Sequence, residues 1–250
     1  MAILWRRLYS GTEYEVRSAG RTIRLYSNGV LHTQFNPAQA VTGNIWDLLF
    51  LPALFLPADS VKRVLVLGVG GGAVIRLLLR YVAPVEITGV ELSAVHIQIA
   101  RRFFAVDKKV ARLVCADASE WVDEYSGEAF DLVIDDLFMH VNAEPERAIA
   151  VDRAWAKKLL SLVKPQGILI VNFESSRQMK QSALICERKM REQLETVLMM
   201  KGPQNENTVG VFSRSEFTSQ TLRQKVRMIP ALTAGKKTTG LRYTVRKLKN

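Results

Sequence analysis

The spacing of hydrophobic positions changes at a glycine-rich stretch near residue 70. Before it, residues Glu13 to Phe35 alternate polar and apolar side chains, with turn-forming dipeptides at Ala19-Gly20 and Asn28-Gly29. Such alternation predicts two or three short antiparallel strands. After it, apolar runs of strand length alternate with segments of helical spacing, which predicts successive strand, helix and strand units.

These repeated units predict a doubly wound, mostly parallel α/β sheet of the Rossmann-like type, preceded by a small antiparallel β extension. Its strands are expected to begin at Val64 and Ile168 and to span 86–92, 111–117 and 130–136; its helices are expected at 73–80, 94–104, 119–125, 152–163 and 178–194. The segments ETVLMM and NTVGVFSRS are expected to close the sheet as a hairpin. We therefore divide the chain into an N-terminal β-hairpin region (1–43), a nucleotide-binding domain (44–214) and a basic C-terminal tail (215–250).

The composition argues against a membrane span, a secreted protein and a metal site. The most apolar segment, Leu48 to Pro57, has about ten residues and contains two prolines, whereas a membrane span needs roughly 20. The first residues lack the apolar core of a signal peptide. Cys115 and Cys186 are too few and too far apart for a disulfide framework or a zinc site. We expect a cytoplasmic protein without a metal ion or a membrane partner.

Positive charge collects near the C-terminus. The 250-residue chain has a formal net charge of +11, and from Lys201 onward 11 lysines and arginines stand against two acids. A basic segment of this kind can bind nucleic acid. Residues 223–250, however, contain one aromatic side chain, Tyr243, and no stacking pattern. A solvated, flexible end is therefore favoured over a contact with RNA or DNA.

The stretch VLVLGVGGGAVIRLLLR, Val64 to Arg80, places four glycines between a predicted strand and a predicted helix. Gly68, Gly70 and Gly72 fit the G-x-G-x-x-A fingerprint of nucleotide-binding turns, in which backbone N–H groups at a helix N-terminus approach a ligand. The alternative is a glycine-rich turn that exists for conformational reasons alone. The motif becomes informative only together with the strands that follow it.

The next three predicted strands all end in acidic residues, at the sheet edge where ligands of such folds bind. Glu91 ends the second strand, where a carboxylate can accept hydrogen bonds from two ribose hydroxyls. Asp117 ends the third and can accept from an adenine amino group, while the N–H of Ala118 reaches a ring nitrogen. Asp135 and Asp136 end the fourth, near the reactive end of the ligand. Each acid also has an ordinary interpretation, and Asp117 could simply cap the following helix.

Two nucleotide classes fit this pattern, a dinucleotide such as NAD and S-adenosylmethionine. A dinucleotide domain is normally followed by a separate substrate domain, and little chain remains here to build one. The turn LVKPQGILIVNF, followed by a helix and a terminal hairpin, is instead typical of the closing half of a class I methyltransferase sheet. S-adenosylmethionine, or its decarboxylated form, is therefore the expected donor.

Together, the segments SNGVLHTQF, VLVLGVGGG, VEL, CADASEWV and FDLVIDD resemble the spermidine synthase-like branch of the class I methyltransferase fold. The resemblance covers about Tyr14 to Arg214. It implies that the glycines line the methionine side of the donor, that Glu91 holds the ribose, and that Asp117 and Ala118 hold the adenine. It further implies that Asp136 accepts a proton from the attacking amine and that Asp135 supports the pocket. The remaining implied donor-site positions are His32, aligned with a family glutamine, and Gln34 on the same strand face.

The chain departs from aminopropyltransferases where that branch binds charged amines. The family's G-G-D-G turn has Gly71 in place of the aspartate, its D-x-x-D-P motif is absent after Asp136, and its Y-x-E motif becomes Ile45, Trp46 and Asp47. A pocket with fewer acids suits a less charged acceptor. We therefore expect a methyltransferase with an unidentified small-molecule acceptor, and at least tenfold tighter binding of the intact donor, because backbone N–H groups of the turn would hold its carboxylate.

Two alternatives stay open. The first is an aminopropyltransferase with a divergent acceptor pocket, and the second is a non-catalytic nucleotide-binding module. The N-terminal strands resemble the part through which spermidine synthases often associate, which favours a homodimer. Among other polar residues, His96 is expected to be packed or solvated rather than catalytic, and His140 is a candidate for acceptor contact. Trp121 packs either beside the adenine or in an ordinary helix-to-sheet contact.

Overall fold

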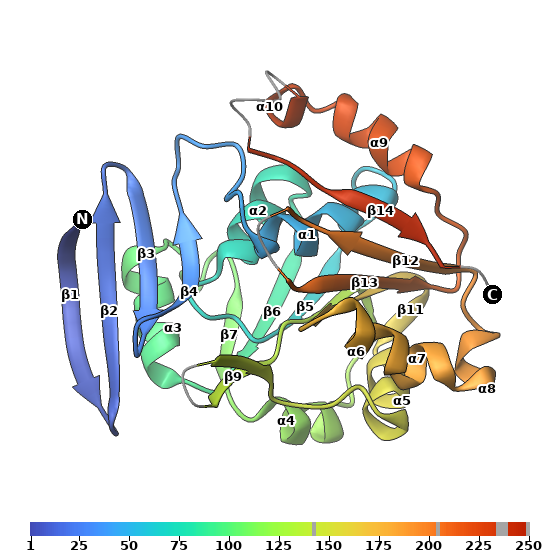
Figure 1. Cartoon of the computed structure of the whole chain (residues 1–250), viewed down its shortest axis with the longest axis horizontal. Helices are drawn as coiled ribbons and strands as arrows, with labels where there is room; N and C mark the ends of the chain where they lie inside the picture. The colour runs from blue at the N-terminus through green and yellow to red at the C-terminus, as the bar shows by residue number, and fades with distance from the viewer. Residues whose placement is uncertain (142–143, 204–205, 234–239, 249–250) are drawn as a thin grey trace.

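The computed structural model describes residues 1–141, 144–203, 206–233 and 240–248. Its N-terminal strands form a four-stranded antiparallel sheet that lies at one side of the molecule (Figure 1), in the order β1 (Ala2–Tyr9), β2 (Thr12–Ala19), β3 (Thr22–Ser27) and β4 (Val30–Phe35). Strand β1 adds one strand to the two or three predicted. Its half-exposed Arg6 pairs with the buried Glu15 of β2, so an ion pair rather than apolar alternation accompanies its pairing.

The larger sheet has eight strands in the order β14-β12-β13-β11-β8-β5-β6-β7. Strands β5, β6, β7, β8 and β11 run parallel, and β13, β12 and β14 are added antiparallel at one edge. This is the predicted doubly wound architecture with its terminal hairpin. The strand bounds are β5 Arg63–Leu67, β6 Glu86–Glu91, β7 Arg112–Cys115, β8 Phe130–Asp135, β11 Val163–Phe173, β12 Thr196–Lys201, β13 Thr208–Ser213 and β14 Thr244–Lys247; a short hairpin, β9 (Phe138–Val141) and β10 (Glu144–Arg147), follows β8.

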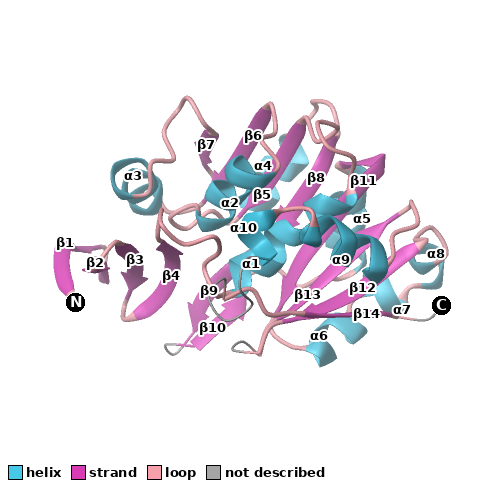
Figure 2. Cartoon of the chain, turned by 90° about the horizontal axis from the view of Figure 1, so that it is seen from above, coloured by secondary structure: helices cyan, strands magenta, loops and turns pink. Residues whose placement is uncertain are grey.

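Helices cover both faces of this sheet, as seen from above in Figure 2. Alternate residues of β5 pack on opposite faces of the sheet. Val64 and Val66 belong to one hydrophobic core, and Leu65 and Leu67 belong to the other. The first core includes side chains of α1 (Ile45–Phe50), α2 (Ala73–Tyr81), α3 (Ala94–Phe103), α9 (Ser219–Arg227) and α10 (Pro230–Thr233); the second includes those of α4 (Ala118–Glu124), α5 (Arg153–Ser161), α6 (Ser176–Gln181), α7 (Ala183–Cys186) and α8 (Arg188–Arg191). The near-continuous apolar strands reflect burial on both sides.

The most apolar segment is buried in the first core. It forms the end of α1 and a 3₁₀ helix, η1 (Leu51–Phe55), and all five residues of η1 are buried. Within the described residues, none of the helices has the length and apolar content needed to cross a bilayer.

The helix expected at 178–194 is divided into α6, α7 and α8. The backbone is extended at Ser182 and at Glu187, with ψ values of 152° and 109°. The hydroxyl of Ser182 donates to the carbonyl of Met179 at 2.7 Å. Serine side chains that bond to nearby backbone compete with helix continuation, which explains the first break.

The expectation of a solvated, flexible C-terminal end is wrong for most of its described part. Strand β14 pairs with β12 and extends the large sheet, and α9 buries Leu222 and Val226 against the first core (Figure 1). The positive charges lie on the outside of these elements, with Lys225 and Arg227 in the last turn of α9. Pairing with a strand more than 40 residues earlier has no local sequence signal, so the pattern of residues 215–250 did not predict it. Residues 234–239 and 249–250 of the predicted tail lie outside the described part.

Candidate functional site

The glycine turn lies between β5 and α2, against the end of β8. Gly68 has a φ of +84°, and a Cβ atom there would collide with the backbone carbonyl of Asp136. Only glycine combines that backbone conformation with so close an approach. The turn and the acidic end of β8 are therefore adjacent, as predicted for a site at the carboxyl ends of parallel strands.

Each of the five backbone N–H groups of the turn already has a protein acceptor. Those of Val69 and Gly70 donate to Glu91 Oε2 at 3.0 and 2.8 Å, and that of Gly71 donates to Thr33 Oγ1 at 2.6 Å. Those of Gly68 and Gly72 donate to backbone carbonyls at 2.9 and 2.8 Å. The expectation that these groups stand ready for a donor carboxylate is therefore wrong for this conformation.

Gly71 is also closed off sterically. A Cβ atom at this position would lie 2.9 Å from both Cβ and Cγ2 of Thr33, which belongs to β4 of the N-terminal sheet. An aspartate there, as in the G-G-D-G turn, would require the two segments to move apart. Gly71 and Thr33 therefore pack directly against each other.

Glu91 is buried at the end of β6 and accepts hydrogen bonds from several sides. Its Oε1 accepts from the N–H of Ser93 at 2.9 Å and lies 3.4 Å from Nδ1 of His96. Burial acts to raise the pKa of Glu91, but His96 and the backbone donors of Ser93 and Gly70 outweigh it, so the pKa lies below its ordinary value. The carboxylate is held ionised, and it reaches the glycine turn from the position predicted for a ribose contact.

Of the packed and solvated alternatives expected for His96, the structure shows the packed one, and the residue links Glu91 to the N-terminal sheet. Its Nε2 lies 2.9 Å from the hydroxyl of Ser27, and its ring centroid lies 4.8 Å from that of His32. His32 also adjoins the turn, because a Cβ on Gly70 would lie 3.0 Å from its carbonyl oxygen. The other candidate on this strand, Gln34, is occupied elsewhere: its amide accepts from Arg24 at 2.7 Å and donates to the carbonyl of Thr42 at 2.9 Å.

Asp117 caps α4. Its Oδ1 accepts from the N–H and hydroxyl of Ser119, at 2.7 and 2.6 Å, and from the N–H of Glu120 at 3.3 Å. The hydrogen bonds from Ser119 lower the pKa of Asp117 below its ordinary value. Ala118 is the buried first residue of that helix. The capping interpretation is thus confirmed, and the adenine contact of Asp117 and Ala118 stays a prediction.

Asp135 and Asp136 are neighbours in sequence, but their side chains lie in different surroundings. Asp135 is fully buried: its Oδ2 accepts from Arg147 at 2.8 Å and from the indole N–H of Trp155 at 2.9 Å. These bonds connect the end of β8 to β10 and α5, and a role of Asp135 in supporting a ligand pocket stays a prediction. Asp136 is half-buried on the other side of the chain, and its Oδ1 accepts from the side-chain amide of Asn172 at 2.7 Å.

The environment of Asp136 raises its pKa to about 7. Burial is the largest cause, and the nearby carboxylates of Asp135 and Glu91 act in the same direction. The bond from Asn172 and the positive charge of Arg147 lower the pKa but do not compensate. Asp136 can therefore exchange a proton near neutral pH, which an exposed aspartate cannot do.

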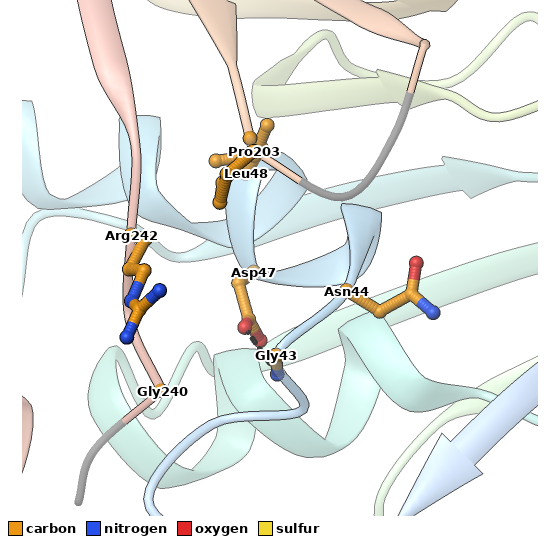
Figure 3. Close-up of a pocket in the computed structure, with 8 residues that line it drawn as sticks. Gly43, Asn44, Asp47, Leu48, Pro203, Gly240 and Arg242 are labelled. Carbon is orange, nitrogen blue, oxygen red and sulfur yellow. Dashed lines mark hydrogen bonds between the residues drawn. The ribbon is translucent and has the colours of Figure 1, made fainter. Parts of the chain in front are cut away.

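A cavity of about 180 Å³ lies beside α1, between the residues that follow β12 and those that precede β14 (Figure 3). Asp47 lines it, but the carboxylate points to its own loop: Oδ1 accepts from the N–H and hydroxyl of Thr42 at 2.8 Å, and Oδ2 accepts from the N–H of Gly43 at 2.7 Å. Burial raises the pKa of Asp47. The Asp47 carboxylate therefore holds the backbone that leads into α1.

Sequence reasoning missed three polar residues that shape the site. Asn172 interrupts the apolar run ILIVNF near the end of β11, so the strand-end rule applied to the acids would have found it. Thr33 and Arg147 carry no such signal, because their roles depend on segments distant in sequence. Of the minor candidates, Trp121 stacks on Tyr125 at 4.7 Å between ring centroids, and the side chain of His140 lies outside the described part. Among described residues, no cluster of three or more His, Cys, Asp or Glu could hold a metal ion.

The glycine turn, the acid-ended strands, the N-terminal antiparallel sheet and the closing hairpin define the spermidine synthase-like form of the class I methyltransferase fold. Residues 64–167 match the family model described as a methyltransferase domain. Among solved structures, a probable spermidine synthase from Corynebacterium glutamicum is similar over 99% of this chain and 91% of its own, with a TM-score of 0.75 and 18% identity. Human methyltransferase-like protein 13, in complex with SAH, is similar over 76% of this chain and 90% of its own, with a TM-score of 0.61 and 15% identity.

A curated relative also matches in sequence. Polyamine aminopropyltransferase 2 from Caldanaerobacter subterraneus subsp. tengcongensis is 29% identical over 133 residues, which are 52% of this chain. The match spans 44% of that relative, less than half of its length. These comparisons agree on a methyltransferase-type fold that also occurs in a probable spermidine synthase.

Proposed function

We propose that this chain is a transferase of the spermidine synthase-like type that transfers an alkyl group from an S-adenosylmethionine-type donor to an amine, with Asp136 accepting the amine's proton. The observation that carries the proposal is the half-buried carboxyl of Asp136, a residue whose backbone carbonyl lies against the glycine turn and whose side chain has a pKa of about 7. A general base works best when its pKa is close to the working pH, because it must be ionised and still basic.

The strand ends supply the remaining groups that such a donor requires. Glu91 at the end of β6 is an ionised acceptor for ribose hydroxyls, and Asp117, just after β7, is an ionised acceptor for an adenine amino group. When bound, the donor supplies a carbon already activated by its sulfonium. The attacking nitrogen forms a bond to that carbon, the carbon–sulfur bond breaks with its electron pair going to sulfur, and the nitrogen's proton passes to Asp136. The protein's contribution is alignment and a site for that proton.

Aminopropyl transfer from decarboxylated S-adenosylmethionine is the first candidate reaction. It is supported by the sequence relative named an aminopropyltransferase and by the structural similarity to a probable spermidine synthase. Methyl transfer is the second candidate, and a specific contact favours it. Thr33 fills the space at Gly71 where an aspartate would attract the free ammonium of the decarboxylated donor, and the Asp47 carboxylate is bound to its own loop.

The test is to incubate the protein with each donor and a panel of mono-, di- and polyamines, and to measure the nucleoside product. Aminopropyl transfer releases methylthioadenosine from the decarboxylated donor, and this is the expected result. Release of S-adenosylhomocysteine from the intact donor alone would move the assignment to methyl transfer. Binding of either donor without any product would support a non-catalytic module, and Asp136→Asn serves as the matched inactive control.

A further inference from the structure

Asn172 is the polar residue of β11 nearest to the proposed base. Asn172 is 3% exposed. Strand β11 lies directly beside β8, and its Val171, the residue before Asn172, pairs with Asp135. Its Nδ2 donates to Asp136 Oδ1 at 2.7 Å. The neighbouring residues from Ile168 to Val171 are all apolar and fully buried, so packing alone would favour another apolar residue here.

A second amide fixes the orientation of the first. Asn207, at the start of β13, donates from Nδ2 to Asn172 Oδ1 at 3.2 Å. An ionised carboxylate can only accept hydrogen bonds, so the end of the Asn172 amide that faces Asp136 must be the NH₂ group. The oxygen then faces Asn207, which satisfies it and opposes an amide flip.

We propose that Asn172 is a positioning residue for Asp136, and that Asn207 holds the Asn172 amide in the orientation that donates to this carboxylate. The inference rests on the proposed function, in which Asp136 is the base. Its physical basis is selective stabilisation: the NH₂ group favours the ionised carboxylate, whereas a flipped amide would accept a hydrogen bond from the protonated form. The pair of asparagines therefore sets how readily Asp136 becomes a base.

The other charged groups around Asp136 come from three elements. Asp135 lies beside it at the end of β8, Glu91 ends β6, and Arg147 belongs to β10. Asp135 and Glu91 raise the pKa of Asp136, while Arg147 lowers it. Arg147 also donates to the backbone carbonyl of Asn172, which ties β10 to the same strand end. Of the groups that favour the ionised form, Asn172 is thus the neutral one, and it can be replaced without changing any charge.

The experiment follows the titration of Asp136 by the ¹³Cγ chemical shift of aspartate-labelled full-length protein, with the signal assigned from Asp136→Asn. Asn172→Leu removes the donor while keeping the branched shape of the side chain. We expect the pKa of Asp136 to rise by about one unit, a tenfold higher proton affinity. Asn207→Ala leaves the donor in place but frees it to flip, so a smaller rise in the same direction is expected.

Ser213→Ala is the matched control. Ser213 is also a buried polar residue of β13, and its hydroxyl donates to the carbonyl of Gly167 at 2.8 Å, near the start of the apolar part of β11 and away from its Asp136 end. The titration of Asp136 should be unchanged in this variant. An equal shift in Ser213→Ala and Asn172→Leu would overturn the inference, because the effect would then be global. So would a folded Asn172→Leu with an unchanged Asp136 titration.

If Asn172→Leu fails to fold, Asn207→Ala decides, and an unchanged titration in that variant overturns the inference. The proposed function fails separately. If the pKa of Asp136 shifts in the variants but no donor gives a product, the coupling between the asparagines and Asp136 stands, and the role of Asp136 as a base is contradicted. Where product forms, the acid limb of the rate profile should move upward with the Asp136 pKa while the KM for the donor stays constant, and an unmoved limb would overturn the inference.

Discussion

Two carboxylates at nearby strand ends, Glu91 and Asp136, are both removed from water but are held in opposite states. Glu91 accepts three backbone N–H groups and faces His96, and its pKa lies below the ordinary value. Within the described residues, Asp136 accepts a hydrogen bond from Asn172, and its pKa rises to about 7. Burial opposes the charge in both cases, so the hydrogen-bond donors and the neighbouring charges together decide which acid stays ionised. One end of the site is built to hold a fixed charge, and the other is built to exchange a proton.

The largest expected effect concerns the proton-exchanging end. Asp136→Asn should lower turnover by roughly 10²–10⁴-fold, the range for loss of a general base, with little change in donor affinity. In the unmodified protein, turnover should increase as the pH rises through about 7, because the ionised form is the active one. Rate profiles and calorimetry measure the two quantities. A parallel fall of turnover and donor affinity would make Asp136 a binding residue.

The fixed-charge end is tested by Glu91→Ala. Donor affinity should fall at least about 100-fold, because two hydrogen bonds to a charged group contribute roughly 1.5–3 kcal/mol each. The fold is affected too, since the N–H groups of Val69 and Gly70 lose their acceptor, and unfolding free energy should drop by about 1–3 kcal/mol. Unchanged affinity by calorimetry would contradict the ribose assignment.

The same residue gives a pH dependence of stability. Since the pKa of Glu91 is lowered on folding, its ionised form stabilises the native protein above the unfolded pKa, and this contribution is lost as the pH falls through the folded pKa. Glu91→Gln should therefore differ most from the unmodified protein at neutral pH and least in acid, which thermal melts can follow.

The contact between Gly71 and Thr33 shows how tightly the fixed-charge end is packed. Gly71→Ala should cost about 1–3 kcal/mol of unfolding free energy, the usual range for overpacking, because the added methyl group would meet Thr33 at 2.9 Å. Its φ is not positive, so steric contact rather than backbone strain sets the cost. A double-mutant cycle with Thr33→Ala checks this, and strictly additive effects would contradict it.

Asp117 is a third carboxylate at a strand end, and its role in capping α4 can be tested separately from a role in ligand binding. Asp117→Ser keeps a good helix cap, so the unfolding free energy should change by less than about 0.5 kcal/mol. Donor affinity should still fall by about tenfold if the carboxylate also accepts from adenine, as one charge-assisted bond is lost. Equal donor affinity in the variant and the unmodified protein would show that Asp117 only caps α4.

The remaining effect is on the stability of the fold at the proton-exchanging end. The pKa of Asp136 is raised on folding, so the unfolded chain ionises first and the native state loses stability as the pH rises from about 4 to about 7. Asp136→Asn removes that loss. The variant should melt at a higher temperature than the unmodified protein at pH 8, and the gain should be smaller at pH 5. An increase in melting temperature that does not depend on pH would show that it does not come from the ionisation of Asp136.

Local sequence patterns predicted the parallel sheet, the glycine turn and the acids at the strand ends, because strand and helix periods and strand-ending residues are properties of short segments. They also predicted the terminal hairpin. The single helix expected at 178–194 was wrong, since Ser182 can bond to its own backbone, a choice that the helical spacing does not reveal.

What only the tertiary structure decided is the state of each acid. Thr33 lies 38 residues from Gly71, and Asn172 lies 36 residues from Asp136, so no spacing rule brings these pairs together. The addition of β14 to the sheet is likewise a long-range pairing. A pKa depends on burial and on the donors that surround a group, and both are assembled from distant segments. The sequence by itself therefore identified where the carboxylates lie, and the fold determined which of them holds a charge and which can take up a proton.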